Sequence, residues 1–339
     1  MAEREDLIIS FLQANGWGSS TRHPLADDAS FRRYERLRAG TRTAVLMDAP
    51  PPHEDVRPFV AIAQHLVELS YSAPRIIAES LKDGLLILED LGDNTYTRVL
   101  SEKPECEAKL YAKAIDLLID LHGRPAAESI PLGLTPYDVG LLNQEALLLP
   151  DWFLPAIMGA PTPASIRASY LAAWQHSLMQ AASRPPTLVL RDFHIDNLMW
   201  LVDRSGNQTC GLLDFQDAVA GPAVYDLMSL LQDARRDIAP DLISTMMERY
   251  LAAFPTLSRD AFQADFAIMA AQRHAKVIGI FTRLCIRDAK SAYLLHIPRV
   301  WRLLDESLKH PALDAVAAWF AEHVPPKLRT TPPNLTRLP

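Results

Sequence analysis

The sequence has 339 residues, of which 49% are hydrophobic and 22% charged, so it has the composition of an ordinary globular protein and room for two domains or one bilobal unit. Its net charge of −7 gives no electrostatic support for binding nucleic acid or an anionic membrane. Three widely spaced cysteines form neither a disulfide framework nor a metal-binding pattern, which favours a reducing compartment. No stretch approaches the roughly 20 apolar residues that span a bilayer. We therefore expect a cytoplasmic protein without a nucleic-acid or membrane partner.

The first ninety residues predict short elements of mixed type. Residues 1–17 indicate an amphipathic helix rather than a signal peptide, because acidic residues accompany the one arginine and no long apolar run follows. Apolar residues then alternate as in strands or recur near a period of 3.6 residues as in helices. The elements predicted in this way are strands within 24–48, a helix at 54–69, and strands at 75–80 and 85–89.

From about residue 93 the pattern changes to long helices. The first carries an apolar stripe from Leu110 to Leu121. The others are predicted at residues 164–182, 222–234, 240–253, 259–287 and 298–321. The fold class is therefore α+β, with a small, mostly β N-lobe over residues 1–90, a larger helical C-lobe over 91–325, and an irregular proline-containing tail over 326–339.

Residues 187–217 (TLVLRDFHIDNLMWLVDRSGNQTCGLLDFQD) contain the most informative pattern in the chain. An apolar run at 188–190 predicts a buried strand that ends just before Asp192. Two further apolar runs, 198–202 and 209–213, flank a polar turn of six residues and predict a β-hairpin.

The hairpin is expected to bring two oxygen-bearing side chains together. If Val202 lies opposite Thr209 across the turn, Asn197 lies opposite Asp214, with Asp192 just upstream. An amide and a carboxylate suit Mg²⁺, which takes one or two protein oxygens together with phosphate oxygens and water. A carboxylate five residues before the asparagine can hold a substrate hydroxyl, and these are the groups that phosphoryl transfer requires. A hairpin with ordinary surface carboxylates is the alternative.

The Asp-x-x-x-x-Asn loop, the hairpin with its Asp-Phe, and the following GPAVYDLMSLLQD resemble the catalytic core of the aminoglycoside phosphotransferase-like kinases. The resemblance covers about residues 20–325 and implies a bilobal, protein-kinase-like fold with ATP as the phosphate donor. It implies that Asp192 is the catalytic base and that Asn197 and Asp214 hold Mg²⁺. It also implies that Asp226 braces the catalytic loop, and we expect His194 to act as a brace rather than as a base.

The nucleotide site has one familiar part. The apolar run at 85–88 ends in Glu89, Asp90 and Leu91, at the change from mixed to helical pattern. In a kinase this segment is the hinge, whose exposed backbone would hydrogen-bond the adenine edge. An ordinary strand end followed by a turn is the alternative.

The phosphate-binding part departs from the family pattern. The chain has no G-x-G-x-x-G or Walker A motif, and no lysine occurs before Lys82. Small residues and backbone amides around Ser30 and Phe31 can approach phosphate oxygens. Arginine can replace the missing lysine, because it is permanently charged and binds phosphate with two donors. Arg32 and Arg33 both remain candidates, with a solvated arginine pair as the alternative, and Glu68 is a possible carboxylate partner.

The same loop, Asp-Ala-Ser-Phe-Arg-Arg-Tyr, followed by Val-Leu-Met-Asp-Ala-Pro-Pro-Pro, is similar to the anomeric cell-wall sugar kinases, which phosphorylate N-acetylmuramate and N-acetylglucosamine at C1 in peptidoglycan recycling. This implies a small-molecule sugar as partner. Two other functions stay open: a kinase of another alcohol, such as an aminoglycoside, choline or homoserine, and a nucleotide-binding pseudokinase, which the missing lysine suggests. The oligomeric state is open. Candidate acceptor-binding residues are Gln216, Asp217, Arg273 and Lys276.

Overall fold

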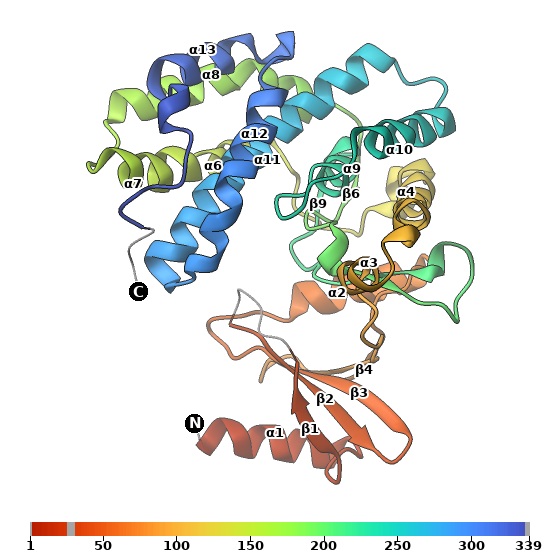
Figure 1. The fold of residues 1–339 in the computed structure, drawn as a ribbon. Coiled ribbons are helices and arrows are strands. Elements are labelled where there is room, and N and C mark those ends of the chain that lie inside the picture. The colour runs from red at the N-terminus through yellow and green to blue at the C-terminus, as the bar shows by residue number, and fades with distance from the viewer. Residues whose placement is uncertain (1, 26–30, 336–339) are drawn as a thin grey trace. The chain divides into compact units, whose positions relative to one another are not determined.

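A computed structural model describes residues 2–25 and 31–335 (Figure 1). Its contacts divide the chain into two compact units: unit 1, Met1–Leu117 with Ile195–Ala218, and unit 2, Leu118–His194 with Val219–Pro339. Unit 1 therefore joins the predicted hairpin to the first part of the chain. The predicted boundaries at residues 90 and 325 stay predictions.

Unit 1 is built on a five-stranded antiparallel sheet in the order β1-β2-β3-β5-β4. The strands are β1 Thr21–Pro24, β2 Arg33–Ala39, β3 Arg42–Asp48, β4 Ile76–Ser80 and β5 Leu85–Leu88. The helices are α1 Ala2–Ala14, α2 Arg57–Glu68 and α3 Tyr96–Glu102, while α4 Glu107–Gly123 crosses into unit 2. The strands predicted within 24–48 are β2 and β3, and those predicted at 75–80 and 85–89 are β4 and β5, but β1 begins before the predicted range. The N-terminal helix forms and ends at Ala14, and α2 begins three residues later than predicted, with a proline in its first turn.

The two faces of this sheet have different roles. One face packs against α1, where Leu37, Leu46 and Ile87 belong to a core cluster with Leu12 and Trp17. Side chains alternate along a strand, so the intervening positions point to the other face. There Arg36 lies opposite Val45, and Val45 lies opposite Leu88, in one row across β2, β3 and β5.

The hairpin forms, but its register differs from the prediction by one residue. Strand β7, Leu198–Trp200, pairs with β8, Cys210–Leu212, so that Leu198 lies opposite Leu212. Continuing this register places Asn197 opposite Leu213, whose amide donates to the Asn197 carbonyl at 2.9 Å. The turn contains a 3₁₀ helix at Gly206–Thr209, which alternation along the strands did not reveal.

Unit 2 is largely helical. Its helices are α5 Ala126–Ser129, α6 Val139–Ala146, α7 Leu154–Met158, α8 Ala164–Ala182, α9 Val224–Leu231, α10 Pro240–Ala253, α11 Arg259–Asp288, α12 Ile297–Ser307 and α13 Asp314–His323. Strand β6, Pro186–Val189, is the predicted strand before Asp192, and it pairs with β9, Val219–Pro222. The predicted helix at 298–321 is instead two helices, because Pro311 begins a 3₁₀ turn between them.

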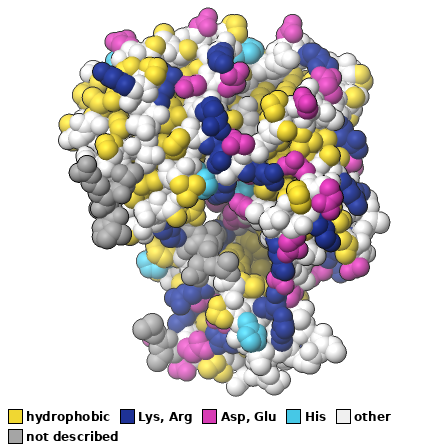
Figure 2. All heavy atoms as spheres, in the orientation of Figure 1, with side chains coloured by type: hydrophobic (Ala, Val, Ile, Leu, Met, Phe, Trp, Pro, Cys, Tyr) yellow, Lys and Arg dark blue, Asp and Glu magenta, His cyan; other side chains and the backbone are white. Residues whose placement is uncertain are grey.

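The α+β prediction, a small mostly β N-lobe and a larger helical C-lobe, is confirmed. Within the described part of the chain, no helix is both long enough and apolar enough to cross a bilayer. On the face drawn in Figure 2, acidic and basic side chains are interspersed.

Candidate active site

Unit 1 contains a cavity of about 530 Å³, a size typical of small-molecule sites. The sheet supplies its apolar side through Val45 and Leu88, and the hairpin supplies Met199 and Leu213. The predicted hinge residues Glu89, Asp90 and Leu91 line the cavity, as do Asn197 and Asp214. The predicted hinge and the predicted metal ligands therefore face one cavity.

Arg36 anchors the hinge segment to the sheet, a contact that the sequence analysis missed. The side chain is buried and lies 2.9 Å from Asp90 and 2.8 Å from Asp93. It also donates to the Gly92 carbonyl at 3.1 Å. The sequence did offer one signal for Arg36: it is next to Leu37, a core residue, so its side chain points to the opposite face of the sheet. No local pattern indicated its partners Asp90 and Asp93, which are 54 and 57 residues away in the sequence.

The hairpin turn reaches the same segment. Arg204 forms an ion pair with Glu89 and donates to the Ser72 hydroxyl at 2.7 Å. The Leu212 amide donates to the Ser72 carbonyl at 2.8 Å. These contacts hold the hairpin beside the strands that carry the hinge.

Asn197 and Asp214 meet despite the one-residue difference in register. Asp214 has a left-handed backbone, with φ of 56°, which interrupts the strand alternation that would otherwise direct its side chain away. The Asn197 amide nitrogen lies 3.3 Å from Asp214 Oδ2, and Gln216 donates to Asp214 Oδ1 at 2.7 Å. Gln216 also lies 3.5 Å from Asp217.

This donor set fits Mg²⁺. A carboxylate and an amide supply hard oxygen ligands, and an amide can turn its oxygen toward a cation because its O and N positions are assigned from hydrogen bonding. Among residues 2–25 and 31–335, no group of three or more His, Cys, Asp or Glu side chains is arranged to hold a metal. A site of two protein ligands completed by phosphate oxygens does not require such a group.

The predicted phosphate-binding residues differ in their surroundings. Ser30 lies outside the described residues. The ring of Phe31 is exposed and stacks on His53 at 5.1 Å, and Arg33 is exposed. The Arg32 side chain is only 10% exposed, with Glu54 at 3.8 Å and Asp214 at 3.6 Å. Among the described residues, Glu54 and Asp214 are therefore acidic neighbours of Arg32, where the sequence suggested Glu68.

In unit 2, Asp226 braces the loop that carries Asp192, as predicted. Its carboxylate accepts hydrogen bonds from the amides of Leu190 at 2.6 Å and Arg191 at 2.9 Å. Arg191 has a left-handed backbone with φ of 69°, a conformation that costs energy in a non-glycine residue. Burial raises the pKa of Asp226 to about 7, against the opposing effect of the two amides.

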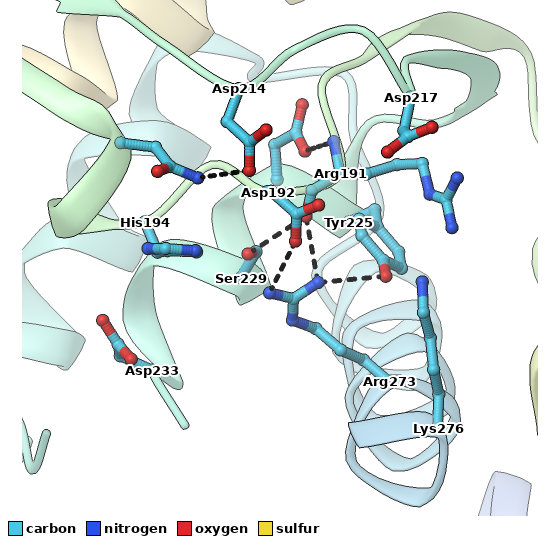
Figure 3. Close-up of polar contacts among 12 residues, drawn as sticks. Arg191, Asp192, His194, Asp214, Asp217, Tyr225, Ser229, Asp233, Arg273 and Lys276 are labelled. Atoms are coloured by element: carbon cyan, nitrogen blue, oxygen red, sulfur yellow. Dashed lines mark hydrogen bonds and ion pairs between the residues drawn. The ribbon is translucent and has the colours of Figure 1, made fainter. Parts of the chain in front are cut away.

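Arg273, from the long helix α11, contacts the same loop from the other side (Figure 3). It donates to the Arg191 carbonyl at 2.9 Å and to the Tyr225 hydroxyl at 3.2 Å, and it lies 3.7 Å from Asp192 Oδ1. Although burial opposes the charged form, Arg273 and Lys276 lower the pKa of Asp192. Asp226 of α9 therefore binds two amides of the loop, and Arg273 of α11 binds a carbonyl of the same loop.

The buried carboxylate of Glu145 contacts the neighbouring cations. The sequence did not indicate this role. Lys276 lies 2.8 Å from Glu145, Gln272 donates to it at 3.2 Å, and Arg191 and Tyr137 contact it as well. Burial opposes its ionisation, but Lys276 and Arg191 lower the pKa of Glu145. Lys276 therefore balances a buried charge rather than lying on a solvated basic face.

His194 fits the predicted bracing role. It is buried, and its Nε2 lies 3.3 Å from Arg235, whose amide donates to Asp233 at 2.8 Å. Burial and Arg235 lower the pKa of His194.

Comparisons with known proteins agree with the resemblance. A model described as the phosphotransferase enzyme family matches residues 21–262. A Caulobacter vibrioides protein named N-acetylmuramate/N-acetylglucosamine kinase is 36% identical, with 97% of this chain and 99% of that protein covered. A protein of the same name from Pseudomonas aeruginosa is 37% identical, with 87% of each covered.

Solved structures share the fold at low sequence identity. A choline kinase from Streptococcus pneumoniae superimposes with a TM-score of 0.61 at 10% identity, covering 91% of this chain and 99% of that one. An aminoglycoside phosphotransferase in complex with GDP and kanamycin gives a TM-score of 0.59 at 15% identity, covering 90% and 99%. With the family model and the near full-length relatives, these findings show that the chain belongs to the phosphotransferase enzyme family.

Proposed function

We propose that this protein is an ATP-dependent kinase that phosphorylates the anomeric hydroxyl of N-acetylmuramate, N-acetylglucosamine or both. The observation that carries the proposal is the set of relatives with that name, 36–37% identical over 87–97% of this chain. The site residues expected of such a kinase, Asp192, Asn197 and Asp214, are all present. A cytoplasmic setting, where ATP is available, belongs to the same proposal.

The nucleotide would occupy the cavity of unit 1. Val45, Leu88 and Met199 offer apolar surface to a base, and the backbone of residues 89–91 offers hydrogen-bonding groups to its edge. Arg36 would keep that backbone in place through Asp90 and Asp93. The predicted nucleotide-binding residues Glu89, Asp90 and Leu91 therefore line a common cavity, and Arg36 anchors this segment at Asp90.

Asn197 and Asp214 would hold Mg²⁺, and Gln216 would orient the Asp214 carboxylate through its hydrogen bond. When bound, the ion would neutralise charge on the triphosphate and orient it for transfer. Asp217 stays a candidate for the acceptor side.

Asp192 would receive the sugar hydroxyl. Its carboxylate accepts the hydroxyl hydrogen bond, orients the oxygen towards the γ-phosphorus of ATP and takes the proton as the new P–O bond forms and the bond from that phosphorus to the bridging oxygen breaks, which releases ADP. Arg273 lowers the pKa of Asp192, which weakens it as a base. An anomeric hydroxyl belongs to a hemiacetal and is more acidic than an ordinary alcohol, so a weak base is sufficient. Because Arg273 and Lys276 are buried against Asp192 and Glu145, we assign them to positioning the loop in preference to direct acceptor binding.

The proposal is tested by measuring ADP release from ATP and Mg²⁺ with a panel of acceptors. N-acetylmuramate and N-acetylglucosamine should stimulate release, whereas choline, homoserine and an aminoglycoside should not. Stimulation by one of the latter alone would overturn the choice of acceptor. ATP binding without ADP release across the panel would favour a pseudokinase.

A further inference from the structure

The residues assigned so far do not include a cation that would bind the triphosphate. No lysine occurs before Lys82, and strand β3 contains only Arg42 as a cation, which lies over the Trp17 ring at 4.4 Å. The position of β3 that lines the cavity is the apolar Val45. Arg36 does line the cavity, but it is already buried between Asp90 and Asp93.

Arg32 lies between two carboxylates of unit 1. Glu54, on the proline-containing loop before α2, lies 3.8 Å from its Nε and also accepts the Phe31 amide at 3.2 Å. Asp214 lies 3.6 Å from its Nη2 and is the proposed metal ligand. Glu54 thus contacts both the Phe31 amide and the Arg32 side chain, just before β2. This places the guanidinium beside Asp214, where the triphosphate and its ion would bind.

We propose that Arg32 is the cation that binds the triphosphate, and that Glu54 is the carboxylate that positions it. The inference rests on the proposed function only in taking the cavity of unit 1 as a nucleoside triphosphate site. Both separations exceed the 2.7–2.9 Å of a tight charge-assisted hydrogen bond, so neither carboxylate fixes the guanidinium closely. With five N–H donors, arginine can keep its contact with Glu54 while binding phosphate oxygens in pairs.

Arg33 is the rival, and its surroundings differ. It is exposed, begins β2 and lies opposite Asp48 in the sheet. Of the two, Arg32 is the one whose side chain lies beside Asp214, whereas the Arg33 side chain is exposed. Arg38, further along β2, is exposed and serves as a matched control outside the site.

The experiment measures the affinity of the full chain for ATP and for adenosine, with Mg²⁺ present, by calorimetry. Arg32→Gln should weaken ATP binding about 10- to 100-fold, since hydrogen bonds to charged groups contribute on this scale, and leave adenosine binding unchanged within about twofold. Arg32→Lys should recover part of the loss, and Glu54→Gln should weaken ATP binding by less than Arg32→Gln. Arg38→Gln should bind both ligands normally.

Three results would overturn the inference: normal ATP binding in Arg32→Gln, an equal loss of adenosine binding in that variant, or a larger ATP loss in Arg33→Gln. None of these readouts involves a sugar. If the wild-type protein binds ATP but phosphorylates no amino sugar, the proposed acceptor fails while the role of Arg32 is still decided by the affinities.

Discussion

Replacing Arg273 by glutamine tests how helix α11 sets the properties of the proposed base. Arg273 touches the catalytic loop at the Arg191 carbonyl and lies 3.7 Å from Asp192. The variant keeps most of the side-chain volume but removes the charge. We expect the acid limb of the kcat/KM profile to move to higher pH, because Asp192 loses the cation that lowers its pKa.

The strength of the interaction that is lost follows from the separation of the two charges and the exposure of Asp192. Two unit charges about 4 Å apart interact by about 4 kcal/mol at an effective dielectric constant of about 20. The Asp192 side chain is 39% exposed, so solvent screening reduces this interaction to about 1–2 kcal/mol, and its loss moves the pKa of Asp192 upward. Losing the hydrogen bond to the loop should also lower kcat about 10- to 100-fold.

The assay is ADP release with N-acetylglucosamine, as a function of pH, for the wild type, Arg273→Gln, Arg273→Lys and Arg287→Gln. Arg287 is on the same helix, exposed and paired with its neighbour Asp288, so its replacement should leave the profile unchanged. Arg273→Lys retains the charge, so its acid limb should return close to that of the wild type, while its kcat should recover less.

Two outcomes would refute the reasoning. A wild-type rate and profile in Arg273→Gln would mean that the contact seen in the loop has no effect on the reaction. A lower kcat with an unmoved acid limb would mean that Arg273 only supports the fold of the loop.

Three further variants test other parts of the site. Asp192→Asn should lower kcat by about 10²–10⁴-fold or more while ATP affinity measured by calorimetry stays within about twofold, and near-normal turnover would exclude Asp192 as the base. For Asp226, burial raises the pKa to about 7, above about 3.9 in the unfolded chain, so its contribution to stability is full below pH ~4 and is lost as pH rises through ~7. The stability of the wild type relative to Asp226→Asn should therefore increase from pH 8 to pH 5 in urea denaturation, and an equal difference at both pH values would contradict the burial effect. Arg36→Met should lower the free energy of unfolding by about 3–5 kcal/mol, because Asp90 stays buried without its cation, whereas Arg38→Met should change it by less than about 0.5 kcal/mol.

Sequence patterns predicted the elements whose bounds depend on neighbouring residues. Helices α8 and α10 end at the residues that the apolar periodicity indicated, and both begin beside a proline. The hairpin was predicted, but its register was not, since the 3₁₀ turn at Gly206–Thr209 has no period of its own. Asn197 and Asp214 still meet, for a reason the alternation could not supply, namely the left-handed backbone at Asp214.

The contacts that position the site were less accessible from sequence. Glu145 interacts with Arg191 and Lys276, 46 and 131 residues away, and its own neighbourhood reads as an ordinary helix. Arg273 and Lys276 were identified as a basic helical face, but periodicity alone could not tell a solvated face from a buried one with carboxylate partners. The interruption between α12 and α13 at Pro311 did have a local signal, a proline inside a helical pattern, but the predicted helix at 298–321 ignored it.

The proposed reaction transfers phosphate to the anomeric oxygen of an amino sugar. Phosphorus NMR of the product formed from ATP and N-acetylglucosamine tests it most directly, through coupling of the phosphorus to the sugar proton next to the new bond. We expect a single phosphate coupled to the proton on C1, and no product from the methyl glycoside in which that oxygen is blocked. A phosphate coupled to the protons on C6, or phosphorylation of the blocked glycoside, would contradict it.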